Sequence, residues 1–251
     1  MLTAPPQRYQ RPDGQLAIRM RSDPEPTCCT SPESGSGQAL STGRCQRHNG
    51  GFPAPHFMTA NSTKSRNRLR IIGGQWRSRI ITFGDTPDLR PTPDRVRETL
   101  FNWVQLPIHG ASCLDLFAGS GILSLEAISR GAASATAVEL DARAAAGIRH
   151  HASELHTTKL TVIQDNVMAW LGKGTGHERY DLVFLDPPYA TGLQAACCAL
   201  LAEGNWLNPG AMVYVEAAGP LESLLFPEGW TLVRSKRAAD VYYGLCQTPA
   251  G

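Results

Sequence analysis

The tetrapeptide Asp186-Pro187-Pro188-Tyr189 follows an apolar run and carries the most specific chemistry in the sequence. Its prolines have fixed φ angles and no backbone N–H groups, so the segment presents carbonyl oxygens to a ligand. The Asp186 carboxylate and the Pro187 carbonyl can accept both hydrogens of an exocyclic amine, whose lone pair then faces an electrophilic methyl group. Tyr189 offers a flat surface for stacking a base. The motif predicts methylation of an amino group on guanine, adenine or cytosine.

A glycine-rich loop, Asp115-Leu-Phe117-Ala-Gly119-Ser-Gly121, joins an apolar run to a helix that begins near Ile122. Its glycines permit a tight turn and close approach to a ligand, and the start of a helix offers free N–H groups. The loop is not GxGxxG, and it lacks the Gly-Lys-Ser/Thr of a phosphate-binding P-loop. A purely structural tight turn is the alternative. We predict that Asp115, Phe117, Gly119 and Gly121 form a cofactor site.

Acidic residues also end the next two predicted strands. Glu139, with Asp141 just beyond it, is placed to accept hydrogen bonds from both ribose hydroxyls of an adenosine. Asp165 can accept from the adenine amino group, while a backbone N–H near Asn166 reads the ring. Each acid alone has an alternative role as a strand-end or helix cap. Because ligands bind at the carboxyl ends of parallel strands, the set predicts a nucleoside cofactor there.

The elements that must position these residues alternate along the chain. Helical periodicity is found in Ile122–Ser129, Ala142–Leu155, Val167–Leu171 and Gln194–Leu201. Strand candidates are Cys113–Phe117, Ala135–Leu140, Leu160–Gln164, Asp181–Leu185, Met212–Glu216, Thr231–Lys236 and Val241–Cys246. The alternation predicts an α/β fold with a mostly parallel sheet covered on both faces, to which the last two strands add an antiparallel strand.

A basic segment precedes this body. Residues 58–110 hold nine Lys or Arg against four acidic residues, whereas residues 111–251 hold nine against fourteen. The segment LRIIGGQWRSRIITF predicts a hairpin with a Gly-Gly turn. A helix follows near Pro93, capped by Thr92 or Asp94, with Val96 and Leu100 at helical spacing. The asymmetry indicates a nucleic-acid arm joined to a catalytic domain, with a solvated basic face as the alternative.

Residues 1–57 are rich in Pro, Ser, Gly, Gln and Arg and show no helical or strand periodicity, so we expect them to be disordered. Met58 is a candidate true start. We divide the chain into a disordered leader, 1–65, a basic hairpin and helix, 66–110, and a domain for the predicted methyl transfer, 111–248; the resemblance described below implies that residues 66–110 serve as RNA arm and cofactor lid. The boundaries rest on the changes of pattern at the ends of these segments.

The 251 residues carry a net charge of +2, with 42% hydrophobic residues, enough for a buried core. The seven cysteines show no metal-ligand spacing and fall partly in apolar runs, so we expect structural thiols, no metal and a reducing, cytoplasmic setting. There is no apolar stretch of membrane-spanning length and no secretory h-region, so we expect neither a membrane partner nor export.

From about Leu69 to Gln247 the chain resembles the RsmD type of bacterial 16S ribosomal RNA guanine-N2-methyltransferases, on the segments LRIIGGQWRSRIITF, LRPTPDRVRETLFNWV and CLDLFAGSGILSLEAISRGA. The resemblance implies a Rossmann-like, seven-stranded methyltransferase sheet with an N-terminal β-hairpin. It also implies S-adenosyl-L-methionine as cofactor. The implied target is a guanine N2 of 16S ribosomal RNA, within the small subunit or an assembly intermediate. We expect a monomer.

The resemblance also implies roles for residues of the basic segment. The helix after Pro93 would close over the methionine end of the cofactor, where Thr92 and Arg97 are candidate contacts, Arg97 for the cofactor carboxylate. Capping and surface ion pairing are the alternatives for these two residues. Arg77 and Arg79 of the hairpin, with Arg70, would contact RNA phosphates, which position the substrate without reading its sequence.

Two other functions fit parts of the sequence. An adenine-N6 methyltransferase of DNA or RNA would use the same Asp-Pro-Pro-Tyr geometry. Sequence-specific DNA recognition generally needs a separate reading domain, yet the stretch from Asp165 to Asp181 is short and no large insertion follows Tyr189. An RNA-binding protein with a vestigial methyltransferase fold is the non-enzymatic alternative, which the intact loop, acids and tetrapeptide disfavour.

Overall fold

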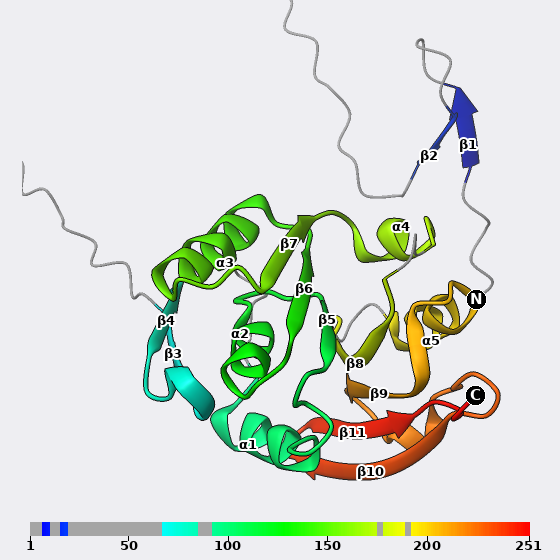
Figure 1. Cartoon of the computed structure of the whole chain (residues 1–251). Coiled ribbons are helices and arrows are strands. Elements are labelled where there is room, and N and C mark those ends of the chain that lie inside the picture. The colour runs from blue at the N-terminus through cyan, green and yellow to red at the C-terminus, as the bar shows by residue number, and fades with distance from the viewer. Residues whose placement is uncertain (1–6, 11–15, 20–66, 85–91, 175–177, 189–191) are drawn as a thin grey trace, which may run out of the picture. The chain divides into compact units, whose positions relative to one another are not determined.

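The computed structural model describes residues 7–10, 16–19, 67–84, 92–174, 178–188 and 192–251 (Figure 1). The chain divides into two compact units, Met1–Thr59 and Ala60–Gly251. In the first unit, the described residues form β1 (Gln7–Gln10) and β2 (Leu16–Arg19), an antiparallel pair. This pair differs from our prediction of a leader without strands. The missed signal is the Pro-Asp-Gly sequence between the two segments, which favours a turn.

The second unit is built on a seven-stranded sheet with the order β10-β11-β9-β8-β5-β6-β7. Its strands are β5 (Ser112–Leu116), β6 (Ser134–Glu139), β7 (Leu160–Gln164), β8 (Tyr180–Leu185), β9 (Leu207–Ala217), β10 (Thr231–Ala238) and β11 (Val241–Gln247). Neighbouring strands pair in parallel from β7 to β9, whereas β11 pairs antiparallel with both β9 and β10. The predicted mostly parallel sheet with one antiparallel strand is confirmed.

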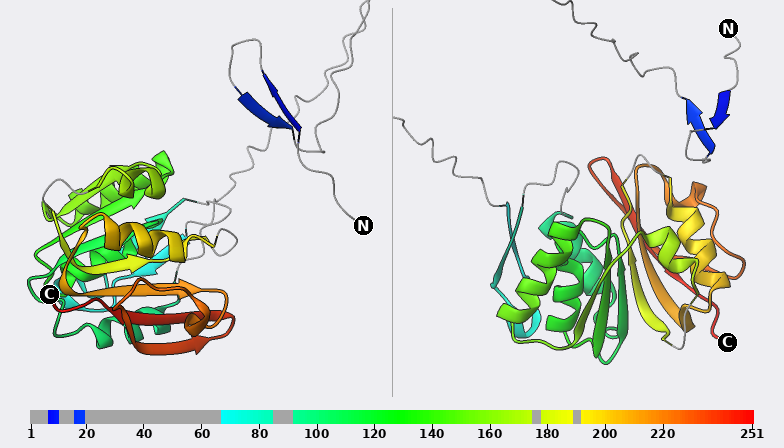
Figure 2. Two further views of the ribbon diagram at one scale, coloured as in Figure 1. Left: turned by 90° about the vertical axis from the view of Figure 1, so that its right-hand side faces the viewer. Right: turned by 90° about the horizontal axis from the view of Figure 1, so that it is seen from above.

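Helices cover both faces of this sheet, as Figure 2 shows. The helices are α1 (Asp94–Trp103), α2 (Ile122–Ser129), α3 (Ala142–Glu154), α4 (Val167–Leu171) and α5 (Gln194–Glu203). One apolar cluster joins α1 and α2 to the sheet, and a second joins α4 and α5 to its other face. Because both faces of the buried strands pack against helices, their sequences are continuous apolar runs.

The basic segment forms the predicted hairpin, β3 (Asn67–Arg70) and β4 (Ile80–Phe83), which pair antiparallel. A 3-10 turn, Gly74–Trp76, lies between them against the end of α2, where the Trp76 N–H donates to the Ser129 hydroxyl. Gly74 has a φ of +76°, and a Cβ atom there would lie 1.8 Å from the Ser129 carbonyl oxygen, so only glycine fits. Every residue of α2 is buried, because α2 lies between this hairpin and the sheet.

The start of α1 differs from the expected capping. Pro93 is the N-cap residue, and no side chain accepts a capping hydrogen bond there. Thr92 is buried next to the site described below, and Asp94 instead pairs with Arg97 one turn along the helix. Both predicted caps are therefore wrong, because the Thr92 side chain contacts Asp186 and the Asp94 side chain contacts Arg97 instead of the free N–H groups of the helix.

Candidate active site

The carboxyl ends of β5, β6, β7 and β8 bring most of the predicted site residues to one edge of the sheet. Asp115 of β5 pairs in register with Phe184 of β8, two residues before Asp186. Glu139 ends β6 and pairs with Gln164, which precedes Asp165. Residues far apart in the sequence thus meet where parallel α/β sheets bind their ligands.

The glycine loop after β5 contains three left-handed residues. The φ angles of Phe117, Gly119 and Gly121 are 64°, 53° and 72°. Gly121 precedes the first residue of α2, and its N–H donates to the Ala118 carbonyl at 2.7 Å. A Cβ atom on Gly121 would lie 2.8 Å from a side-chain carbon of Ile148. At Gly121 both the backbone angle and the packing therefore favour glycine.

Asp115 is buried and directed at the helix that follows the loop. Its Oδ2 accepts hydrogen bonds from the Ser124 N–H at 3.1 Å and the Ser124 hydroxyl at 2.6 Å. Burial raises the pKa of Asp115 to about 7, although the Ser124 hydrogen bonds oppose the shift. Asp115 therefore ties β5 to the first turn of α2 and fixes the loop between them. Sequence reasoning missed Ser124, which sits within an apolar helix.

Glu139 is held against the glycine loop. Its Oε2 accepts from the Gly119 N–H at 2.6 Å, and its Oε1 accepts from the Asp141 N–H at 2.8 Å. Asp141 itself caps α3, because its carboxylate accepts from the N–H groups of Arg143 and Ala144. The structure thus brings together Glu139 and Gly119, while the Asp141 carboxylate is engaged in capping.

The acid after β7 has a cationic partner that the sequence did not reveal. Asp165 Oδ2 lies 2.6 Å from Lys173 Nζ, and Oδ1 accepts from the Asn166 N–H at 2.8 Å. The hydrogen bond from Lys173, followed by that from Asn166, lowers the pKa of Asp165, which stays ionised. The Asn166 side chain caps α4 by accepting from the Ala169 N–H. Asp165 and Asn166 both lie at the predicted edge of the sheet. The amide oxygen and the backbone N–H of Asn166, however, already form the hydrogen bonds to Ala169 and Asp165.

Asp186 directly follows β8 and is half-buried, Pro187 is buried and Pro188 is exposed. Tyr189 lies outside the described residues. The Thr92 hydroxyl is hydrogen-bonded to the Asp186 carboxyl, so Thr92 reaches the predicted catalytic acid. Burial is the main cause that raises the pKa of Asp186 well above its ordinary value, and the charges of Glu216 and Asp115 raise it further.

Glu216, near the end of β9, is a buried acid that sequence reasoning did not single out as a site residue. It is 1% exposed, and its Oε1 accepts a hydrogen bond from the Tyr214 hydroxyl at 2.7 Å. Leu185 pairs in register with Val215, so Asp186 and Glu216 follow neighbouring positions of adjacent strands. The register of β8 and β9, which the sequence does not disclose, is the signal that brings Glu216 to the site.

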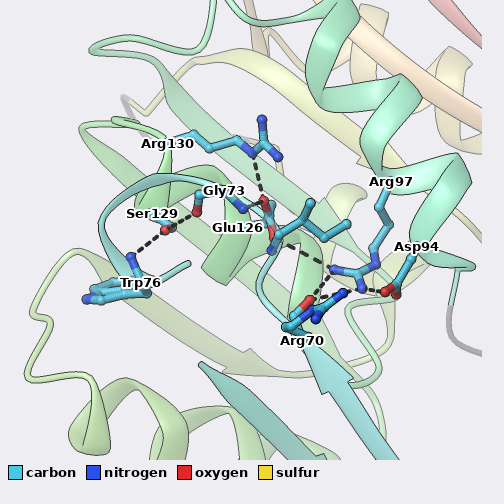
Figure 3. Close-up of polar contacts among 9 residues, drawn as sticks. Arg70, Gly73, Trp76, Asp94, Arg97, Glu126, Ser129 and Arg130 are labelled. Atoms are coloured by element: carbon cyan, nitrogen blue, oxygen red, sulfur yellow. Dashed lines mark hydrogen bonds and ion pairs between the residues drawn. The ribbon is translucent and has the colours of Figure 1, made fainter. Parts of the chain in front are cut away.

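Arg97 has a different role from the one expected (Figure 3). Its side chain is fully buried, and its Nη1 and Nη2 each donate to the Arg70 carbonyl at 3.1 Å. Asp94 and Glu126 are its acidic neighbours. The predicted contact with a cofactor carboxylate is therefore wrong in this structure, since the guanidinium is enclosed between the hairpin, α1 and α2.

Glu126 is the centre of the contacts that attach the hairpin to α2. Its carboxylate accepts from the backbone N–H groups of Ile72 and Gly73, each at 2.7 Å, and from Arg130 Nε at 2.7 Å. One turn along α2, the Ser129 hydroxyl accepts from the Trp76 N–H and donates to the Gly73 carbonyl. Figure 3 shows the contacts of Gly73, Arg130 and Arg97 converging on Glu126, with the Ser129 contacts beside them. They hold the basic hairpin in a fixed place on the catalytic body.

The hairpin arginines predicted to bind RNA, Arg70, Arg77 and Arg79, have exposed side chains. Their contact with phosphate stays a prediction. Among the described residues, no group of three His, Cys, Asp or Glu side chains could hold a metal ion. Within the same residues, no helix is long and apolar enough to cross a membrane.

Comparison with known proteins assigns the chain to a family. The profile of the family described as "Conserved hypothetical protein 95" matches residues 69–247. The sequence is 45% identical over 184 residues to ribosomal RNA small subunit methyltransferase D of Escherichia coli K12, covering 73% of this chain and 91% of the relative. The Haemophilus influenzae protein of that name is 40% identical, with 73% and 95% covered. The solved structure of the putative methyltransferase yhhF from Escherichia coli matches with a TM-score of 0.67 and 42% identity, covering 74% of this chain and all of that one.

Proposed function

The chain belongs to the family of RsmD-type methyltransferases, and on this premise we propose that it transfers a methyl group from S-adenosyl-L-methionine to the exocyclic N2 of a guanine in 16S ribosomal RNA. The observation that carries the proposal is the position of Asp186-Pro187-Pro188. The motif leaves β8 beside the glycine loop of β5, so an amine acceptor and a methyl donor can occupy one edge of the sheet.

The described residues fit this cofactor. The left-handed glycine loop and the start of α2 offer a close backbone surface. The carboxylate of Glu139 beside that loop suits ribose hydroxyls, and the ionised Asp165 suits an adenine amino group. When bound, the cofactor supplies an electrophilic methyl group on a positively charged sulfur. The acids of this edge add negative potential around that charge.

The chain's own groups prepare the amine for attack. The amino nitrogen of guanine is a poor nucleophile because its lone pair is delocalised into the ring. The Asp186 carboxylate and the Pro187 carbonyl accept its two hydrogens and turn the lone pair toward the methyl group. The nitrogen bonds to the methyl carbon as that carbon gives up its bond to the donor sulfur, which keeps the electron pair. The nitrogen becomes positive, and the Asp186 carboxylate stabilises that charge. The nitrogen–hydrogen bond then breaks and the proton passes to the Asp186 carboxylate. Thr92 holds this carboxylate in place.

The hairpin serves as the RNA arm in this proposal. Arg77 and Arg79 supply phosphate contacts, and Glu126 keeps their strands attached to the helix that follows the cofactor loop. The substrate is the small ribosomal subunit or an assembly intermediate, and the enzyme acts as a monomer. Residues 66–110 form the arm and lid, and residues 111–248 the catalytic domain. Reversing both charges, Arg77→Glu with Arg79→Glu, should weaken RNA binding and reduce its salt dependence.

The test is methyl transfer from labelled S-adenosyl-L-methionine to small subunits that lack the modification, with double-stranded DNA in parallel. The product nucleosides are separated after digestion. Label in N2-methylguanosine from the subunits is the expected result. Label in N6-methyladenine would move the target to adenine while keeping the chemistry at Asp186. Cofactor binding without any label would favour an RNA-binding protein with a vestigial site.

A further inference from the structure

We propose that Lys236 and Arg237, near the end of the edge strand β10, form a second binding surface for phosphates of the substrate RNA, a few nucleotides from the target base. The inference rests on the proposed function, because it names a further contact of the same substrate. This surface is separate from the hairpin. It belongs to the sheet of the catalytic body and lies on the side of Asp186 away from the cofactor strands β5, β6 and β7.

Positive charge in the last part of the chain is confined to one strand. Residues 181–251 hold seven acidic residues but only three Lys or Arg, namely Arg234, Lys236 and Arg237. All three lie in β10, and all three are exposed. Asp240, in the turn that follows, is the one acidic residue within 231–247. The strand is therefore a basic surface on an otherwise acidic part of the domain, and a polyanion is the partner that complements it.

The strand register places this surface level with the predicted catalytic acid. Lys236 pairs with Tyr243 of β11, which in turn pairs with Glu216 of β9. The pairing of β8 with β9 sets Glu216 level with Asp186 at the carboxyl edge of the sheet. Neighbouring strands are about 4.8 Å apart, so three strand spacings put the Lys236 backbone about 14 Å from that of Asp186. Because a nucleic-acid strand in a duplex carries one phosphate about every 3.4 Å along its axis, phosphates close to the target base can reach β10.

Aromatic rings lie beneath both cationic side chains. The Lys236 ammonium is 5.8 Å from the centre of the Trp103 ring of α1, which itself stacks on β11. The Arg237 guanidinium is 5.1 Å from the centre of the Tyr242 ring, and its Nε donates to the Ala239 carbonyl at 2.8 Å. Within the described part of the chain, neither cation forms an ion pair with a carboxylate. The rings restrict the two side chains, so less conformational entropy is lost when a phosphate binds.

Helix α1 connects this edge with the RNA arm. Near its start Arg97 donates to the hairpin carbonyl of Arg70, and at its end Trp103 lies under Lys236. Figure 1 shows α1 between the hairpin and the pair β10–β11. Thr92, just before α1, contacts the predicted catalytic acid. The hairpin and β10 are thus basic surfaces on two sides of one helix, and one RNA can contact both while its target base lies at the acid.

Edge strands also carry charged residues for another reason, because exposed charge prevents pairing with the strands of other molecules. That role requires neither cations level with the catalytic acid nor rings beneath them. Consecutive side chains point to opposite faces of a strand, and on an edge strand both faces are open to a phosphate backbone that runs along the edge. The position of Lys236 and Arg237 therefore favours a role in binding RNA.

The test compares RNA binding by the full chain and by the double variant Lys236→Gln with Arg237→Gln. Affinities for deproteinised 16S ribosomal RNA and for small subunits that lack the modification are measured over a range of salt concentrations. Loss of two phosphate contacts should lower the slope of log affinity against log salt by about 1.5 and weaken binding about tenfold or more at low salt. The matched control is Lys159→Gln with Arg179→Gln. It removes an exposed lysine and an exposed arginine that precede β7 and β8, at the opposite edge of the sheet, and should leave the slope unchanged.

Two further measurements separate charge from structure. Lys236→Arg with Arg237→Lys keeps both charges and should retain the wild-type slope. In methyl transfer, the neutral double variant should raise KM for small subunits about tenfold or more and leave kcat and the Kd for S-adenosyl-L-methionine unchanged, because phosphate contacts hold the ground state and the transition state equally.

The outcomes distinguish this surface from the proposed function. An unchanged slope with normal methyl transfer would overturn the surface and leave the function standing, and self-association of that variant would show that the cations only protect the edge. Weaker binding to subunits but not to deproteinised RNA would indicate a protein partner and also overturn the proposal. A lowered slope with label in a nucleoside other than N2-methylguanosine would support the surface and contradict the function. No RNA binding by the wild-type chain would overturn both.

Discussion

The attachment of the hairpin to the catalytic body should depend on Glu126. In wild type its two carboxylate oxygens accept from the Ile72 and Gly73 N–H groups and face two guanidinium groups, with no exposed surface on the Glu126 side chain. In Glu126→Gln one oxygen remains, and an NH₂ group replaces the other. In either orientation that NH₂ group faces a backbone N–H and an arginine guanidinium, neither of which accepts a hydrogen bond. The fully buried Arg97 also loses a negative neighbour.

The magnitude follows from these losses. Leaving one buried N–H group without an acceptor costs about 1–3 kcal/mol, and removing one partner of a buried ion pair costs about 3–5 kcal/mol. Arg97 keeps Asp94 and the Arg70 carbonyl as partners, and Arg130 is partly exposed, so the lower part of these ranges applies. We expect the free energy of unfolding to fall by about 4 kcal/mol.

Urea unfolding measures the total loss, and hydrogen exchange locates it. The amides of Ile72, Gly73 and Trp76 should exchange faster in Glu126→Gln, while amides of β5 and β8 should change only as far as global stability falls. The control is Glu98→Gln, because Glu98 is exposed on α1. Surface substitutions usually change the free energy of unfolding by up to about 0.5 kcal/mol. If Glu126→Gln lowers it by less than this and the three amides exchange as in wild type, Glu126 does not hold the hairpin in place.

Three further substitutions test the cofactor edge. Gly121→Ala places a Cβ atom 2.8 Å from Ile148 on a residue whose φ is +72°. Calorimetry should therefore show cofactor affinity lowered by about tenfold or more, and the free energy of unfolding should fall by about 1–3 kcal/mol. Unchanged affinity would mean that the loop tolerates a side chain. Glu139→Gln should weaken binding by about 1.4 kcal/mol, a tenfold change in Kd, and an equal Kd would exclude Glu139 from the ribose site. The pKa of Asp115 rises from 3.8 to about 7 on folding, so the native state binds this proton more tightly and the group's contribution to stability falls as pH rises from about 4 to about 7. Asp115→Asn keeps an acceptor for Ser124 and removes this pH-dependent contribution. The unfolding free energy of the variant, measured in urea titrations, should therefore rise relative to that of wild type as pH increases across this range. If the two unfolding free energies change in parallel with pH, the raised pKa of Asp115 is contradicted.

The sequence predicted the parts of the site that local patterns specify. Asp186-Pro187-Pro188 and the loop at Gly119 carry their own backbone restrictions, so their positions after strands could be predicted directly. Strands alternating with helices likewise predicted the parallel sheet, and the last two strands predicted the antiparallel β11. These features depend on a few consecutive residues.

The remaining parts depend on contacts between distant segments. Glu216 lies in an apolar run and enters the site only through the register of β8 and β9. Arg97 has the spacing of an exposed helical cation, yet the hairpin carbonyl of Arg70, 27 positions earlier, encloses it. Lys173 pairs with Asp165 across a short helix, a contact that no motif signals. Periodicity along one segment carries no information about such partners.

The most direct test of the central claim is to measure turnover and cofactor affinity of Asp186→Asn side by side. Asparagine keeps the size and one acceptor oxygen but cannot take up the amine proton or stabilise positive charge as a carboxylate does. We expect turnover on small subunits to fall about a thousandfold, while the Kd for S-adenosyl-L-methionine stays within about threefold, a free-energy change of less than about 1 kcal/mol. Turnover within tenfold of wild type would contradict the assignment of the amine chemistry to Asp186.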